Sequence, residues 1–337
     1  MNETGERVSR VYSGFRGVDF RGEEINLIRS PDSLNVWKDY KETESIRTRP
    51  ELKSVEQFTN TIHGIYFHKQ RTFVHTGTTI YTKVGNGALV ALGNAVNDAP
   101  SNGFVFEDTF YFMDGKNYLY WNEEDRVFAD VVGYVPTTSI ARKPQSGGTT
   151  HEDVNMLQRK RINTFRADGN SKEFWLDAED IDADFAPVVE SLDNQKLPEY
   201  TVDYKKGTIT FATVPSAPLT DGKDNISVEF AKTVDKYKNS ILGCTLLQVF
   251  DNRVFVSGNP DYPNVVWHCS LNDPTYFSDT DYYREGMDEA QVTGMVAGNN
   301  ALWVFREPSD ANTNVFYHTP AVDDTHGKIY PSSHSSV

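Results

Sequence analysis

A repeated strand-and-turn unit constrains this chain more than any other feature of its sequence. Short runs rich in Val, Ile, Phe, Tyr, Thr and Trp are separated by Gly, Asn, Asp and Pro, which is typical of strands joined by tight turns. Four stretches share one order: an apolar strand, a polar turn, a second apolar strand, another turn, and a third strand ending in aromatic residues. They begin at Ile62, Ser101, Cys244 and Val292. Because helical periodicity is scarce elsewhere, we expect a mainly β protein.

The spacing of these units indicates the kind of β fold. Gly64 and Gly103 occupy equivalent places 39 residues apart, and Leu247 and Gly294 lie 47 residues apart. Repeats of roughly 40 to 50 residues with three or four strands each are typical of β-propeller blades, which bury their apolar faces against neighbouring blades. We therefore predict an all-β fold, a β-propeller. Four units, or five if the N-terminal segment adds one, are few for a closed ring, so we expect an incomplete propeller whose remaining blades lie beyond Val337.

The interval between the second and third units is too long for one blade. Alternating residues in 200–204 and 208–211 flank a turn at Lys206-Gly207, which predicts a hairpin, and Ile226, Val228 and Phe230 alternate with polar residues. We predict a small β-sandwich here, inserted into the propeller and preceded by the flexible segment RKPQSGGTTHEDV. The predicted parts are an N-terminal connecting or closing segment at 1–60, first blades at 61–156, the inserted β-sandwich at 157–238, and further blades at 239–337.

The charge and the two cysteines exclude several classes of protein. The formal net charge is -15, with the acidic excess mainly in 168–238 and 271–337. Such a surface gains no affinity by neutralising phosphates, so we do not expect sequence-specific DNA binding. We expect no membrane association, because a run of about 18 apolar residues and a secretory signal are both missing from the sequence. Cys244 and Cys269 are too few for a disulfide framework and are expected to be buried free thiols.

One acidic motif begins like a calcium loop and then fails. Asp180, Asp182 and Asp184 stand at alternate positions, as in an EF-hand. Phe185 takes the place that requires Gly, and Ser191 takes the place of the bidentate Glu. We therefore expect a solvated acidic loop.

Other searches for chemistry also predict no site. His63, His68 and His75 lie along successive predicted strands without the spacing of metal ligands, and the sequence contains neither a Gly-x-Ser-x-Gly elbow nor a Walker loop. Among the tryptophans, Trp121, Trp267 and Trp303 fall in repeat strands and are expected to pack between blades. Trp37 and Trp175 remain open to stacking on sugars or bases. We predict no catalytic residues, no cofactor-binding residues, no metal ligands, no cofactors and no enzymatic activity.

Two stretches resemble a known family. GFRGVDF, SPDSLNVW and IRTRP, starting at Gly14, Ser30 and Ile46, resemble the opening of tailed-phage virion proteins of the packaged-DNA-stabilisation and tail-nozzle type. DNRVFVSGNPDYPNVVWHCSLNDPTYFSD resembles a blade of the same proteins. The resemblance covers 14–83 and 239–337. Taken by pattern alone, the segment SPDSLNVWKDY is expected to be a short helix or a loop.

The resemblance implies a bacteriophage virion structural protein of the head-to-tail connector or tail nozzle, assembled in the host cytoplasm. It would form a ring of copies, expected to be a hexamer, and contact the portal or adaptor and other tail proteins. It would retain packaged DNA and form part of the conduit for ejection, with genomic DNA passing through without sequence-specific binding. A channel lined by negative charge is compatible with this role, because it repels phosphates.

Two other functions remain open from the residues alone. A propeller or sandwich of this kind could recognise host-surface glycans through an exposed aromatic side chain such as that of Trp175. A glycosidase built on a propeller would need a pair of converging carboxylates, which the sequence cannot identify among its many acidic residues.

Overall fold

The computed structural model describes residues 36–38, 46–48, 54–93, 95–308, 314–323, 327–330 and 332–335. The chain divides into two compact units, 1–59 and 60–337. In the first unit, β1 (Val36–Lys38) pairs antiparallel with β2 (Ile46–Thr48). The expected short helix or loop around Val36–Lys38 is therefore wrong, because these residues form a strand. Of the N-terminal motifs, residues 14–20, 30–35 and 49–50 lie outside the described residues.

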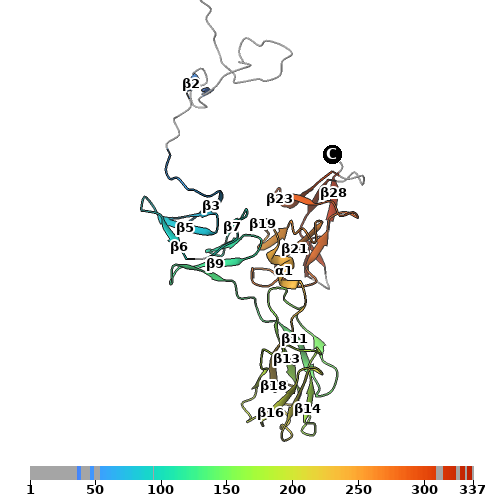
Figure 1. Cartoon of the computed structure of the whole chain (residues 1–337). Helices are drawn as coiled ribbons and strands as arrows, with labels where there is room; N and C mark the ends of the chain where they lie inside the picture. The colour runs from blue at the N-terminus through green and yellow to red at the C-terminus, as the bar shows by residue number, and fades with distance from the viewer. Residues whose placement is uncertain are drawn as a thin grey trace, which may run out of the picture. The chain divides into compact units, whose positions relative to one another are not determined.

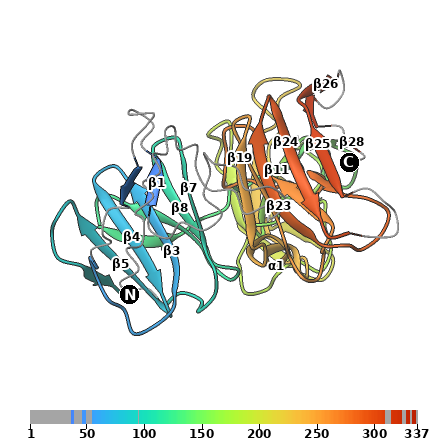
Figure 2. The same ribbon diagram turned by 90° about the horizontal axis from the view of Figure 1, so that it is seen from above.

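In the second unit, four sheets are antiparallel meanders whose strands follow one another along the chain (Figure 1). We call them sheets A to D. In Figure 2 the strands within sheet A lie next to one another, as do the strands within sheet D. Sheet A contains β3 (Ile62–His68), β4 (Arg71–Thr76), β5 (Thr79–Val84) and β6 (Val90–Leu92). Sheet B contains β7 (Asn102–Phe106), β8 (Thr109–Met113), β9 (Tyr118–Asn122) and β10 (Val127–Asp130).

Sheets C and D follow the inserted part of the chain. Sheet C contains β19 (Leu246–Phe250), β20 (Arg253–Ser257), β21 (Val265–His268) and β22 (Tyr282–Arg284). Sheet D contains β23 (Val292–Gly298), β24 (Ala301–Arg306), β25 (Val315–His318) and β28 (Ser332–Ser335). A small hairpin of β26 (Ala321–Asp323) and β27 (Gly327–Ile329) precedes β28. Each predicted unit thus forms one sheet, with a fourth strand beyond the three expected.

The four sheets pack in chain order. The first strand of each sheet lies against the first strand of the next, so that β3 meets β7, β7 meets β19, and β19 meets β23. A separate apolar core fills each of the three interfaces between neighbouring sheets, which we call seams. The A–B core includes Phe73, Phe110 and Trp121; the B–C core includes Phe104, Val256 and Trp267; and the C–D core includes Phe255, Leu302 and Phe316. Burial of these faces against each other is the main stabilising contribution to the row.

Two equivalent glycines make room for one ring in the A–B seam. The Tyr66 side chain lies so close to Gly64 that a Cβ there would overlap its hydroxyl. A Cβ on Gly103 would lie 2.6 Å from the Tyr66 ring and 2.7 Å from the Phe110 ring. The glycines that mark the repeat are therefore required by the close approach of β3 and β7.

We expect Gly103→Ala to lower the free energy of unfolding by about 2 kcal/mol, because a methyl group must push apart two aromatic rings in a packed core. Gly294→Ala is the matched control, since Gly294 lies in the first strand of sheet D and its Cβ would meet nothing within 4 Å. Chemical denaturation of both variants measures the effect. Equal stability of the two variants would contradict the role assigned to Gly103.

The part between sheets B and C is a two-sheet insert. One sheet has the order β12-β11-β13-β18-β15 and the other has the order β14-β17-β16. The strands of the insert are β11 (Thr137–Arg142), β12 (Thr149–Thr150), β13 (Lys160–Phe165), β14 (Glu173–Trp175), β15 (Val188–Ser191), β16 (Tyr200–Asp203), β17 (Thr208–Phe211) and β18 (Ile226–Ala231). The expected hairpin is β16 with β17, and the expected alternation in 226–230 places Ile226, Val228 and Phe230 in the insert's core.

The insert begins earlier than the predicted residue 157. The strand β11 pairs in parallel with β13, and β12 pairs with β11, so 137–150 belongs to the insert's sheet. The segment expected to be flexible turns through Gly147 and Gly148, both with positive φ, which favours glycine. The chain leaves the insert through α1 (Tyr237–Leu242), whose six residues are too few for a periodic signal. No helix in the described part of the chain is long and apolar enough to cross a membrane.

Candidate functional site

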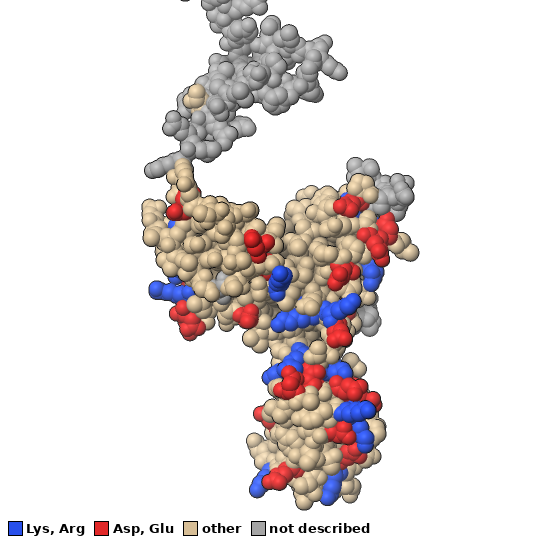
Figure 3. Space-filling view, in the orientation of Figure 1, with Lys and Arg blue, Asp and Glu red and all other residues tan. Residues whose placement is uncertain are grey.

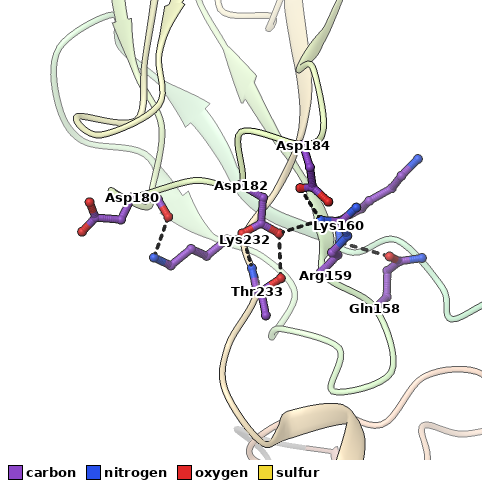
Figure 4. A network of polar contacts seen from close by, with 8 residues as sticks. All are labelled: Gln158, Arg159, Lys160, Asp180, Asp182, Asp184, Lys232 and Thr233. Atoms are coloured by element: carbon purple, nitrogen blue, oxygen red, sulfur yellow. Dashed lines mark hydrogen bonds and ion pairs between the residues drawn. The ribbon is translucent and has the colours of Figure 1, made fainter.

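Asp182 and Asp184, from the sequence that begins like a calcium loop, form a network of ion pairs and hydrogen bonds at the base of the insert (Figure 4). We call this network the clamp. Arg159, just before β13, donates to Asp182 at 3.0 Å and to Asp184 at 2.7 Å. Asp182 also accepts hydrogen bonds from the backbone N–H and the hydroxyl of Thr233, just after β18. Burial would raise the pKa of Asp182, but the Thr233 and Arg159 hydrogen bonds outweigh it and lower this pKa. The clamp therefore ties the start of β13 to the segment after β18, through which the chain leaves the insert.

Asp180 does not join this clamp through its carboxylate. Its backbone carbonyl accepts from Lys232 Nζ at 2.8 Å, and its side chain points away from Asp182 and Asp184. Among the described residues, no three His, Cys, Asp or Glu side chains form a group that could hold a metal ion. The prediction of a solvated acidic loop is confirmed for Asp184, whose side chain is 69% exposed although it binds Arg159. It is wrong for Asp182, whose side chain is 15% exposed and is held by neighbouring groups.

One buried amide attaches the insert to sheet C. Asn155 Nδ2 donates to the carbonyls of Tyr134 and Thr275, each at 2.9 Å. Its Oδ1 accepts from the backbone N–H groups of Phe277 and Leu157. Both donors and the acceptor of Asn155 are thus used on backbone groups from three segments. The turn-rich sequence NDPTYFSD, at 272–279, therefore serves as the surface on which the insert is anchored.

A polar cavity of about 490 Å³ lies at the same junction. Its acidic residues are held by neighbours: Glu152 by the Tyr134 hydroxyl, Asp153 by the hydroxyls of Ser278 and Thr280. Arg161, which is 8% exposed, lies over the Phe230 ring beside this cavity. The groups lining the junction are thus arranged mainly to join the insert to sheet C.

The A–B seam contains a chain of hydrogen bonds that includes His75, one of the histidines that the sequence places on a strand. His75 Nε2 donates to the Gly77 carbonyl at 3.0 Å, so its Nδ1 is the acceptor for the Ser101 hydroxyl at 2.8 Å in the neutral ring. Burial lowers the pKa of His75, which favours that neutral form. The Tyr66 hydroxyl in turn donates to Ser101. The contact between Ser101 and His75 resembles the serine-histidine pair of a catalytic triad. In a triad a carboxylate orients the histidine, whereas here a backbone carbonyl orients His75.

The other two histidines singled out in the sequence have separate neighbours. His63 contacts Asp98 at 2.5 Å, and its ring lies 5.0 Å from that of His75. His68 is buried, with Nε2 lying 4.0 Å from a carboxylate oxygen of Glu123. The structure therefore brings His63 and His75 together beside the seam and leaves His68 apart.

The C–D seam holds a buried acid-base pair that sequence reasoning missed. His318 Nε2 lies 2.5 Å from Glu285 Oε1, and both side chains are 0% exposed. His318 Nδ1 donates to the Tyr330 carbonyl at 3.0 Å. Both ring nitrogens of His318 therefore face oxygen atoms that can accept a hydrogen bond. Glu285 lies in the turn-rich stretch YYREGMD, which carries no periodic signal of burial.

Two titratable groups of sheet C have strongly shifted pKa values. Burial is the main cause that raises the pKa of Asp281 to about 6. Arg253 opposes the rise, and the carboxylates of Asp153 and Asp279 add to it. Burial lowers the pKa of His268 to about 4. Between pH about 4 and about 6 the folded chain binds a proton at Asp281 that the unfolded chain releases, so Asp281 makes stability fall as pH rises. His268 acts in the opposite direction, because the unfolded chain binds its proton there.

We expect Asp281→Asn to raise the free energy of unfolding at pH 7 by about 2 kcal/mol, because the variant no longer buries a carboxylate. His268 and His75, whose pKa values are both lowered by burial, then dominate this window, so stability should rise with pH between about 4 and about 6.5. Chemical denaturation across this pH range measures both effects. The exposed Asp235, substituted to Asn, is the control. An unchanged pH profile in the Asp281 variant would contradict the assignment.

The remaining residues singled out in the sequence have these positions. Trp121 and Trp267 are buried in the seams, as predicted, and Cys244 and Cys269 are buried free thiols, also as predicted. Burial raises the pKa of the Cys269 thiol to about 12, so it is unreactive near neutral pH. Trp303 is half-buried on the outer face of sheet D, and Trp175, on β14, is 48% exposed. The side chain of Trp37 lies outside the described residues.

Charge on the insert is mixed on the face shown in Figure 3. Lys and Arg alternate with Asp and Glu over this surface, although the insert carries an acidic excess in sequence. A surface of both signs favours solubility more than attraction of one kind of ligand.

Comparisons with known proteins assign no family. No family model matches the chain, and no curated protein matches it. Among solved structures, the computationally designed Ika8 protein is 10% identical, with 78% of this chain and 72% of that chain covered and a TM-score of 0.25. PorZ of Porphyromonas gingivalis is 8% identical, with coverage of 81% and 42% and a TM-score of 0.18. Hsv2 of Kluyveromyces lactis is 11% identical, with coverage of 82% and 98% and a TM-score of 0.17. Likenesses this low carry no argument about fold or function.

Proposed function

We propose that this chain is a non-enzymatic structural protein of a tailed-phage particle, in the head-to-tail connector or tail nozzle. In this role it retains packaged DNA and forms part of the conduit through which DNA is ejected. The observation that supports the proposal most is the row of four stacked sheets, in which polar side chains mainly fasten sheet to sheet and insert to sheet. Such an arrangement suits a rigid part of an assembly.

The proposal includes a finer description of the fold: sheets A to D are consecutive blades of a β-propeller. In a propeller the first strand of each blade lines the centre and neighbours the first strand of the next blade. The contacts of β3 with β7, β7 with β19 and β19 with β23 follow this rule. The insert then branches from the connection between the second and third blades.

The proposed partners are further copies of this chain in a ring, the portal or adaptor and other tail proteins. The formal net charge of -15 supports passage of DNA without binding, because a negative channel wall repels phosphates. A hexamer would multiply this field sixfold.

Localisation on the particle tests this proposal. Purified virions are imaged by electron microscopy with gold-labelled antibody raised against the full chain. The proposal expects label where the tail joins the head or along the tail nozzle. Label confined to the capsid surface or to fibre tips, or particles without the chain, would overturn it.

A second function, recognition of a host-surface glycan, has one observation in its favour. The indole of Trp175 is 48% exposed on β14 of the insert, and an exposed indole offers a flat apolar face on which a sugar ring can stack. A glycan array probed with the full chain tests this function. Binding that Trp175→Ala abolishes and Leu219→Ala, at another exposed site of the insert, leaves intact would favour it over the structural role; absence of binding would exclude it.

A further inference from the structure

One buried arginine at the base of the insert has no polar partner in the described part of the chain. The buried residues of β13 are Phe165, which belongs to the insert's apolar core, then Asn163, then Arg161. Asn163 donates to the Thr138 hydroxyl at 3.0 Å, whereas Arg161 donates no hydrogen bond to any residue that the structure describes, and its Nε is buried without a partner. A buried N–H without an acceptor costs free energy, so a molecule that supplies an acceptor is stabilised at this position.

The guanidinium of Arg161 belongs to the wall of the junction cavity of about 490 Å³. The side chain is 8% exposed, so its position is fixed by its surroundings. The second arginine of the cavity, Arg142, already donates to the carbonyls of Trp175 and Leu176 and to a serine hydroxyl. Arg161 therefore supplies the unused cationic donors in the described lining of a cavity whose size is typical of small-molecule sites.

Three carboxylates of the same cavity have one oxygen in use and one unused. Each accepts from a hydroxyl of the protein, at 2.9 Å for Asp279, 2.7 Å for Asp153 and 2.5 Å for Asp177. The second oxygen of each accepts no hydrogen bond from the residues that the structure describes. The cavity thus offers hydrogen-bond donors at Arg161 and acceptors at these three carboxylates.

An aromatic hollow adjoins the polar cavity. Asp279 lines both, and the second hollow, of about 170 Å³, is also lined by Tyr237 and Tyr282. Tyr282 is 44% exposed, and its backbone N–H donates to the carbonyl of Thr280, which lines the polar cavity. Burial and the hydrogen bond to Asp279 raise the pKa of Tyr237 to about 12, and the positive charge of Arg161 opposes this rise. The polar cavity and the aromatic hollow therefore meet at Asp279.

We propose that this junction binds a neutral sugar residue. Each sugar hydroxyl can accept from Arg161 and donate to a carboxylate such as that of Asp279, which is the combination that the cavity offers. The exposed ring of Tyr282 provides a flat apolar face for the C–H groups of the sugar. An anion such as phosphate fits less well, because the lining carries four carboxylates against two arginines. A cation fits less well too, because it leaves Arg161 without an acceptor.

This site goes beyond the proposed function and does not depend on it. It is also distinct from glycan recognition through Trp175, which lies on β14 and lines neither of the two hollows. If gold labelling places the chain away from the tail, the proposed function fails and the sugar site is unaffected. If no sugar binds, the sugar site fails and the structural role stands.

Saturation-transfer difference NMR of the full chain tests the site with the methyl glycosides of glucose, galactose, mannose and N-acetylglucosamine. We expect at least one of them to bind. Arg161→Met keeps a long side chain over the Phe230 ring but removes the N–H donors, so it should raise the Kd about tenfold. Tyr282→Ala should raise the Kd about fivefold. Trp175→Ala, the matched loss of an exposed aromatic ring, should leave the Kd unchanged.

Several results would overturn the proposal. They are absence of binding by all four glycosides, a Kd that Arg161→Met leaves unchanged, and loss of binding in Trp175→Ala, which would place the sugar on β14. Inorganic phosphate and free lysine are measured in parallel, and tighter binding of either than of any glycoside would show that the cavity selects charge. Thermal unfolding checks that Arg161→Met folds. If it does not fold, the exposed Tyr282→Ala decides, and an unchanged Kd in that variant contradicts the site.

Discussion

His318→Leu is expected to lower the free energy of unfolding by about 3 kcal/mol, one of the largest effects of a single substitution in this chain. The change removes the imidazole from Glu285 in a site where both side chains are 0% exposed, so a buried carboxylate loses one of its partners. Chemical denaturation at neutral pH, followed by tryptophan fluorescence, measures the loss.

A second substitution separates charge from packing at this position. Glu285→Gln added to His318→Leu replaces the carboxylate by a neutral amide, which costs less to bury. The double variant should recover more than half of the stability lost by His318→Leu. If it is no more stable than the single variant, the loss comes from packing, and the pairing of His318 with Glu285 does not explain it.

The second large effect is expected in the insert, where Gly207→Ala should lower the free energy of unfolding by about 3 kcal/mol. Gly207 has φ +63° in the turn between β16 and β17, and a Cβ there would overlap the backbone carbonyl of Ala178. Two terms therefore add: a left-handed backbone, which costs a residue with a Cβ about 1 kcal/mol, and a clash with main-chain atoms that cannot rotate away.

Gly222→Ala is the matched control for the clash. Gly222 has φ +80°, and its Cβ would meet nothing within 4 Å, so this variant carries the backbone cost alone, about 1 kcal/mol. Hydrogen exchange of the β18 amides measures local stability of the insert in both variants. Equal losses at the two positions would show that the Ala178 carbonyl moves aside and that the close contact has no cost.

The strands with strong alternation were predictable from the sequence, and the short ones were not. The β16–β17 hairpin follows from local residues, with Gly207 at its turn. The fourth strand of each meander sheet was missed because strands such as β6 and β22 have three residues each, too few for a pattern. The start of the insert was missed because β11 joins its sheet through a parallel pairing with β13, which no local pattern indicates.

The contacts of the polar side chains, in the insert and in the seams, were predictable only in part. The alternate spacing of Asp182 and Asp184 could not indicate Arg159, their partner from a distant segment of the chain. The Glu285–His318 pair joins residues 33 positions apart, and its burial depends on the packing of sheet D onto sheet C. Sequence patterns report the periodicity of one strand, whereas these contacts depend on how whole sheets stack.

The central claim, that the chain is a structural part of the head-to-tail connector or tail nozzle, is tested most directly by locating it on intact particles. Gold-labelled antibody against the full chain is applied to purified virions, and the label is counted by electron microscopy at the tail vertex, the capsid surface and the fibre tips. The account predicts label concentrated where the tail meets the head or along the nozzle. Label confined to the capsid surface or the fibre tips would contradict it.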